Sequence, residues 1–237
     1  MIFGFSTGAL ARSDFHAALQ MLTRKRVRAV ELSALREGEL LPLVEQLDNL
    51  DLTGFEYVSF HAPSAMDPSF EGQALRALEK VAERAWPIIV HPDAMHDRRS
   101  WQRLGKSLCL ENMDKRKPIG QTAHDLAELF EALPDACFCF DIGHARQVDP
   151  TMSEASAILG CFRQRIRQLH ISEVNAQSKH DCLSLESIMA FQKVSHLVPK
   201  DIPVILESRV EESAILDEIE SAGAALNPEN LLAAAGD

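Results

Sequence analysis

Histidine and acidic residues recur at the ends of short apolar segments along almost the whole chain. Seven of them stand within one residue of the end of such a segment: Glu31, His61, His91, Glu111, Asp141, His170 and Glu207. Imidazole nitrogens and carboxylate oxygens are the ligands that Zn²⁺, Mn²⁺ or Fe²⁺ accept in proteins. A single acidic residue after an apolar segment is usually a helix cap or a solvated loop charge, so the prediction of a metal site depends on the whole set.

The segments that must position these residues are of two alternating types. Stretches with apolar residues three and four apart have the period of an amphipathic helix, as at Phe15, Ala18, Leu19 and Leu22. Between such stretches lie eight short β-rich runs, at residues 2–5, 29–32, 57–60, 88–90, 107–110, 136–140, 168–171 and 204–206. Successive runs start about 30 residues apart, as in a βαβ unit, except after the fourth run, where only a short helix fits.

Capping residues mark three helix starts. Asp14 precedes the first apolar stripe, Thr122 is followed three residues later by Asp125, and Ser153 opens a third helix. No linker rich in Pro, Gly or Ser and no low-complexity tract divides the chain. We therefore expect one domain over residues 1–237.

Eight strands that alternate with helices form either a closed (β/α)8 barrel or an open doubly wound sheet, and periodicity alone does not separate the two. The residues at the strand ends separate the two folds. A closed barrel gathers its strand ends around one axis, whereas an open sheet would scatter them along an edge. We predict the α/β class and a single-domain (β/α)8 TIM barrel.

Composition excludes several other classes of protein. The 237 residues carry a formal net charge of −11, which gives no general attraction for nucleic acid or an anionic membrane. No apolar run is long enough for a membrane span, and the start of the chain lacks the pattern of a secretory signal, so a cytoplasmic protein is expected. The five cysteines have no CxxC spacing and are expected to be small apolar fillers, including Cys137 and Cys139 on one strand face.

Six stretches on consecutive predicted strands carry a family resemblance: SFHAPS, IIVHPD, LCLENMD, FCFDIGHA, QLHISEVN and VILESR. In this order they resemble the xylose isomerase-like barrel superfamily, which includes sugar isomerases, sugar epimerases and apurinic-site endonucleases. The resemblance covers nearly the whole chain, and the D-x-x-H spacing of Asp141 and His144 is specific in combination with the other stretches. It implies a TIM barrel with a divalent metal at the carboxyl ends of the strands.

The resemblance also implies a ligand set. In the epimerases a single divalent metal (Zn, Mn, Mg, Co or Fe) is held by a quartet that corresponds here to Glu111, Asp141, His170 and Glu207. The nuclease branch holds up to three ions, and its additional ligands correspond to His61, His91, His144 and His180. Ser178 stands where that branch has an aspartate, so a third ion would lack one ligand.

Two reactions are compatible with these residues. As a sugar isomerase or epimerase of carbohydrate metabolism, the protein would use Glu111 and Glu207 to move a proton between opposite faces of a carbon beside a metal-chelated carbonyl. As a metal-dependent hydrolase or phosphodiesterase, it would use Glu111 as a bridge between two ions that activate water. We expect the first, with the second and a non-catalytic metal-binding relative as alternatives.

Basic residues that follow strand ends are the candidates for contact with a small sugar or sugar phosphate: Lys115, Arg116, Lys117, Arg146, Lys179 and Arg209. The epimerase branch has an arginine where this chain has Ala176, which leaves the substrate open. Ser64 stands where the nuclease branch has an aromatic residue, which disfavours nucleic acid. The sequence does not determine the number of subunits, and a homo-oligomer is one of the possibilities.

Two further groups of residues have no assigned ligand role. Glu31 is expected either to contact substrate or to pack inside the barrel. Basic residues that precede or enter strands belong to the opposite end of the barrel and are expected to complement helix C-termini: Arg24, Lys25, Arg26, Arg28, Arg163, Arg165 and Arg167.

Overall fold

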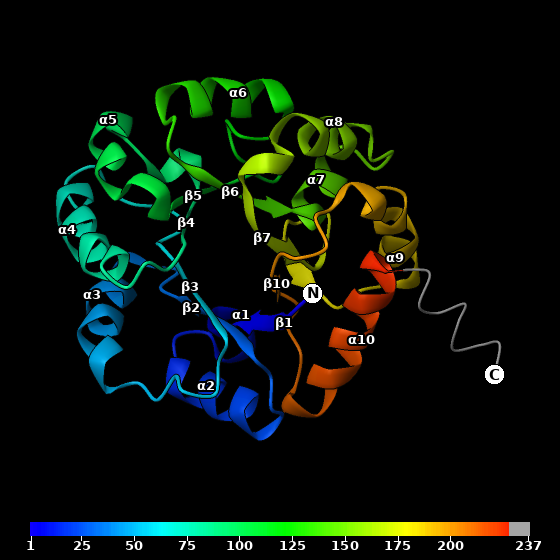
Figure 1. Ribbon diagram of the computed structural model, residues 1–237, viewed down its shortest axis with the longest axis horizontal. Coiled ribbons are helices and arrows are strands. Elements are labelled where there is room, and N and C mark those ends of the chain that lie inside the picture. Colours follow the sequence, from blue (N-terminus) through cyan, green and yellow to red (C-terminus); the bar gives the residue numbers. More distant parts are fainter. Residues whose placement is uncertain (228–237) are drawn as a thin grey trace.

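The computed structural model describes residues 1–227 and shows a closed barrel of eight parallel strands (Figure 1). The barrel strands are β1 (Phe3–Ser6), β2 (Ala29–Ser33), β3 (Tyr57–His61), β4 (Ile88–Val90), β5 (Leu108–Glu111), β6 (Cys137–Asp141), β7 (Ile166–Ile171) and β10 (Val204–Leu206). β10 pairs with both β1 and β7, which closes the ring. The predicted single-domain (β/α)8 barrel is confirmed, although the predicted extent to residue 237 reaches beyond the described residues.

Most of the helices form a ring outside the barrel, while the short α1 (Thr7–Ala11) and α7 (Ile142–Val148) lie nearer the strand ends and contribute Gly8, Ala9 and His144 to the barrel mouth (Figure 1). The other helices are α2 (Phe15–Arg24), α3 (Glu37–Gln46), α4 (Glu71–Ala82), α5 (Arg98–Trp101), α6 (Ala123–Ala132), α8 (Ser153–Phe162), α9 (Leu185–Gln192) and α10 (Ile215–Leu226). As expected, the connection after β4 holds no long helix: it consists of the short α5 and two 3₁₀ segments, Pro92–Ala94 and Gln102–Ser107. None of the helices in the described part is long and apolar enough to cross a membrane.

Local sequence explains where the helices begin and which face they bury. Asp14 caps α2 by accepting a hydrogen bond from the Ala17 amide, and Thr122 with Asp125 forms the reciprocal capping box of α6. The predicted stripe of α2 is buried against the barrel at Ala18, Leu19 and Leu22. Burial of each large apolar side chain contributes roughly 1.5–3 kcal/mol, which is what holds the helices on the strands.

The interior of the barrel contains buried polar side chains, whereas the core between the strands and the surrounding helices is apolar. The Ser6 and Ser33 hydroxyls are hydrogen-bonded at 2.6 Å, and the Ser59 hydroxyl donates to Glu31 at 3.2 Å. A small apolar cluster also fills the interior: Ile89, Cys109, Cys137 and Cys139. The expectation of filler cysteines is therefore right for these three, but it is wrong for Cys161 and Cys182, which are exposed.

A short hairpin that the sequence analysis does not predict follows β7. It consists of β8 (Glu173–Val174) and β9 (His180–Asp181), paired antiparallel. Strands of two residues are too short to show an alternating pattern, so periodicity gives no signal for them. The hairpin matters because it carries His180 back toward the barrel mouth.

Candidate metal centre

Barrel closure brings the strand-end residues together although they are far apart in sequence. His61, Glu111 and Asp141 are the last residues of β3, β5 and β6. His170 is the penultimate barrel residue of β7, while His91 and Glu207 directly follow β4 and β10. Parallel strands place all of these ends at one mouth of the barrel.

The carboxylate of Glu111 lies at the middle of the group and is fully buried. Its Oε2 atom is 3.3 Å from Nε2 of His61 and 3.3 Å from Nε2 of His91. Its Oε1 atom is 3.3 Å from Nδ1 of His170 and 3.4 Å from Nδ1 of His144. The two oxygens of one carboxylate thus face two different pairs of imidazoles.

Four overlapping donor groups lie at this mouth, and within each group the potential ligand atoms lie within 4.8 Å of one another. Three of them consist of the eight predicted ligands, and the fourth joins Glu31 to His61 and Glu207. One is the predicted quartet of Glu111, Asp141, His170 and Glu207. The second joins His61 and His91 to Glu111, and the third joins Asp141 to His144 and His180. Glu111 therefore belongs to two groups, and so does Asp141.

The chemistry of these residues fits a divalent cation. Within residues 1–227, Oδ2 of Asp141 is buried without a hydrogen-bond partner, which is costly unless another ligand satisfies it. Burial, with the negative charges of Glu111 and Glu207, raises the pKa of Asp141 well above its usual range. A cation among these oxygens would relieve the repulsion and allow Asp141 to ionise.

The D-x-x-H spacing works because α7 begins directly after Asp141. The Asp141 carboxylate accepts a hydrogen bond from the His144 amide at 2.6 Å, so it caps the helix and lies beside the imidazole one turn on. Gly143 allows this turn to approach β7, since a Cβ atom there would be 2.5 Å from the carbonyl oxygen of Ser172. The helix start fixes both potential ligands.

Asn112 is a positioning residue that the sequence analysis missed. Its amide group donates to the Asp141 carbonyl and accepts from the Asp141 amide, both at 2.8 Å, and its own carbonyl is 2.9 Å from Nδ1 of His144. Asn112 thus ties the end of β5 to the end of β6. An asparagine directly after a strand-end glutamate was the available signal, although asparagine is equally common in loops.

Glu31 packs inside the barrel, which was one of its two expected roles. Its Oε2 atom lies 3.0 Å from Nε2 of His170 and accepts from the Gln168 amide at 2.6 Å. Because Nε2 of His170 faces Glu31, Nδ1 is the atom that faces Glu111 and Glu207. Gln168 is a second supporting residue that the sequence analysis missed.

A cavity of about 450 Å³ opens above the donor groups, and three of the predicted basic residues line it: Arg116, Lys117 and Arg209. Arg116 pairs with Asp114 at 3.1 Å and Lys117 with Asp93 at 2.8 Å. Burial opposes ionisation of Asp114, but hydrogen bonds from Arg116 outweigh it and lower the pKa of Asp114 to about 2. Ser178, at the position of the missing aspartate, donates to Asp114 at 3.0 Å.

The other three predicted basic residues do not line this cavity. Arg146 forms ion pairs with Glu173 at 3.4 Å and Glu186 at 2.8 Å. Lys115 and Lys179 are exposed in loops beside the mouth. Their expected contact with substrate stays a prediction.

Comparison with solved structures identifies the fold as that of the xylose isomerase-like TIM barrels. A xylose isomerase domain protein from Alicyclobacillus acidocaldarius superposes with a TM-score of 0.66 at 14% identity, over 94% of this chain and 98% of that one. Endonuclease IV from Thermus thermophilus gives 0.63 at 17% identity, over 96% and 100%. A xylose isomerase domain protein from Planctomyces limnophilus gives 0.58 at 12%, over 98% and 96%.

The similarity lies in structure rather than in sequence. No protein-family model matches the chain, and no curated protein matches it. The predicted resemblance to the xylose isomerase-like barrels is confirmed at the level of the fold. The reaction has to be argued from the residues at the barrel mouth.

Proposed function

We propose that this protein is a metal-dependent hydrolase that cleaves a phosphate ester of a small molecule. One observation carries the proposal: Glu111 directs one carboxylate oxygen at His61 and His91 and the other at His170, so that it belongs to two donor groups. A carboxylate in this position would be shared by two divalent ions. Two ions held close together by a shared carboxylate are typical of enzymes that hydrolyse phosphate esters.

The roles of the residues follow from their positions. Bound divalent ions would neutralise phosphate charge and make water a better nucleophile. His61, His91 and the quartet would hold them, and Asn112 and Glu31 would orient two of the ligands. Arg209 lines the cavity without a carboxylate partner among the described residues, so it is the basic residue best placed to bind an anionic substrate.

The size of the cavity and the charge of the chain favour a small substrate. A volume of about 450 Å³ accommodates a phosphorylated sugar or a molecule of similar size. Two of the three lining cations are already paired with aspartates, and the net charge is −11. Long polyanions gain most of their affinity from many unpaired cations, which supports a small ester over nucleic acid.

Sugar isomerisation or epimerisation, the expected reaction, is the second candidate. The observation that favours it is that Glu111 and Glu207 belong to one four-residue donor group, as paired proton-transfer residues around a single ion would. Under this reading His61 and His91 have no essential role. Those two histidines therefore distinguish the candidates.

The experiment compares wild type, His91→Ala and the matched control His124→Ala, which removes an exposed histidine on α6. Metal content is measured after loading with Zn²⁺ or Mn²⁺, and activity is measured with p-nitrophenyl phosphate, bis-p-nitrophenyl phosphate and a panel of aldoses and ketoses. We expect at least two ions per wild-type chain, one fewer in His91→Ala, and loss of phosphate-ester cleavage in that variant alone. One ion per chain in all three proteins, with sugar turnover intact in His91→Ala, would establish the isomerase instead.

A further inference from the structure

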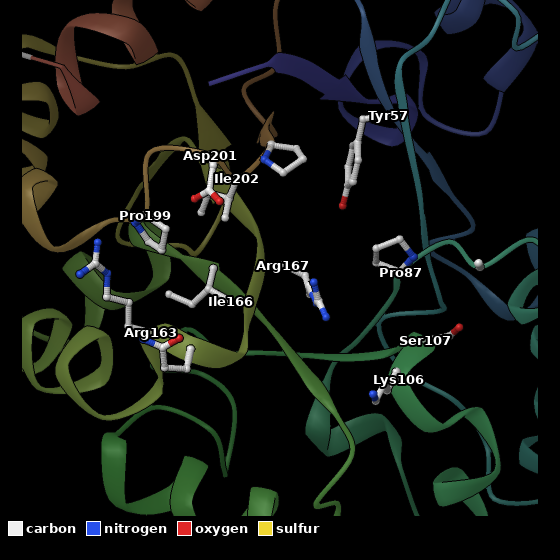
Figure 2. A pocket seen from close by; sticks show the side chains of 13 residues that line it. Tyr57, Pro87, Lys106, Ser107, Arg163, Ile166, Arg167, Pro199, Asp201 and Ile202 are labelled. Carbon is white, nitrogen blue, oxygen red and sulfur yellow. The ribbon is translucent and has the colours of Figure 1, made fainter.

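A second, larger cavity lies at the opposite end of the barrel from the candidate metal centre. Its volume is about 920 Å³, and it is lined by residues at or just before the starts of strands, such as Tyr57 of β3, Pro87 before β4 and Ile166 of β7. Figure 2 shows these residues around one opening, with Arg167 near the middle. Ligand sites of small molecules commonly have volumes of roughly 300–1,000 Å³.

Three basic residues line the cavity, and none of them is part of an ion pair in the described part of the chain. Lys106, Arg163 and Arg167 line it, against a single acidic residue, Asp201. None of the three forms an ion pair with a carboxylate within residues 1–227. In an acidic chain with a net charge of −11, three unpaired cations around one hollow form a local positive patch.

Three other basic residues at this end have partners. Arg24 pairs with Glu212 at 2.7 Å, and Arg28 pairs with Glu56 at 2.6 Å. Arg165 donates to the carbonyls of Pro134 and Ala136, just beyond the C-terminus of α6, as the sequence analysis expected for this group. Arg163 is the C-cap residue of α8, in line with that expectation, whereas Arg167 lies within β7 and at no helix end. Both line the cavity because the start of β7 borders it.

Neutral polar groups complete the lining. Ser107 and Gln164 add a hydroxyl and an amide, and the Asp201 carboxylate can accept hydrogen bonds from hydroxyl groups. The Tyr57 hydroxyl donates to the Gln168 side chain at 2.7 Å, so its hydrogen is already bound to a residue inside the barrel. The combination of guanidinium, ammonium and hydroxyl-binding groups suits a phosphate joined to a hydroxylated body.

We propose that this cavity is a binding site for a phosphorylated small molecule with a hydroxylated body, held at its phosphate by Lys106, Arg163 and Arg167. The site is distinct from the metal centre, since buried side chains such as Cys109, Cys139 and Gln168 fill the barrel between the two ends. The proposal does not depend on the proposed hydrolase activity.

The chain offers a local probe, because Tyr57 is its only tyrosine. Metal-loaded protein carrying ¹³C-labelled tyrosine therefore gives one tyrosine ring signal, located at this cavity. The protein is titrated with inorganic phosphate, glucose 6-phosphate, AMP and, as an uncharged control, glucose. The variants are Arg167→Gln and Lys106→Gln, with Arg28→Gln as the matched control at the same end and Arg209→Gln as the control at the metal centre.

We expect a saturable shift of the Tyr57 signal with at least one phosphorylated organic probe and none with glucose. Arg167→Gln and Lys106→Gln should each raise the Kd about tenfold or more, while both controls leave it unchanged; thermal melting checks that all variants are folded. The proposal is overturned if no phosphorylated probe shifts the Tyr57 signal, or if Arg167→Gln binds as tightly as wild type. Binding that Arg209→Gln removes would also overturn it.

Discussion

Glu31 Oε2 lies 3.0 Å from Nε2 of His170, and both side chains are completely buried inside the barrel. This contact directs Nδ1 of His170 toward Glu111, at 3.3 Å. A carboxylate behind a metal-binding histidine fixes the orientation of the ring and increases its basicity. Glu31 thus connects the barrel interior to the candidate metal centre.

Removal of this contact should weaken metal binding. We expect Glu31→Ala to lower the affinity for Zn²⁺ by about 10- to 100-fold, the usual effect of losing such a partner. Competition titration with a chromogenic chelator measures the change, and Glu45→Ala, an exposed glutamate on α3, is the control. Equal affinity in Glu31→Ala and wild type would mean that His170 is oriented by other contacts or is not a ligand.

Asn112 should influence the same metal centre through its hydrogen bonds to the backbone of Asp141. We expect Asn112→Ala to release the end of β6 and to reduce the number of ions bound per chain, because Asp141 and His144 both depend on its hydrogen bonds. Elemental analysis after gel filtration gives the stoichiometry, with the exposed Asn49→Ala as control. Unchanged metal content would contradict the positioning role.

The metal-free protein should show a pH-dependent contribution of His61 to stability. Burial lowers the pKa of His61, but the hydrogen bond and charge of Glu111, with the charges of Glu31 and Glu207, outweigh it and raise that pKa from 6.5 to about 9. A group whose pKa is raised on folding stabilises the folded state below pH 6.5 and loses this effect as pH rises through 9. In EDTA, the difference in Tm between wild type and His61→Gln should therefore shrink from about pH 6 toward about pH 9.5. A difference that stays constant or grows over this range would contradict the assignment.

A carboxylate outside the metal centre should be important for stability. Glu71 accepts hydrogen bonds from the indole of the fully buried Trp101 at 2.8 Å and from the amides of His96 at 2.7 Å and Asp97 at 3.1 Å. We expect Glu71→Ala to lower the free energy of unfolding by about 2–4 kcal/mol, since it leaves buried donors unpaired. Urea denaturation measures the loss, and a change below about 0.5 kcal/mol would show that water replaces the carboxylate.

Much of the fold could be predicted because its signals are local. The capping by Asp14 and the Thr122–Asp125 box depend on contacts within one turn, and a helix stripe depends on residues three and four apart. The β8–β9 hairpin could not be predicted, since its strands have two residues each. The two exposed cysteines were misjudged because composition does not say which face of an element a residue occupies.

The sequence by itself determined the alternation of strands and helices and the placement of histidine and carboxylate at the strand ends, because both depend on neighbouring residues along the chain. Only the tertiary structure decided that Glu111 lies between two pairs of histidines, that Glu31 supports His170, and that Lys106, Arg163 and Arg167 surround a common hollow. The physical reason is ring closure: when β10 pairs with β1 and β7, residues more than a hundred positions apart come within hydrogen-bonding distance, and the direction of each side chain then depends on its neighbours in space.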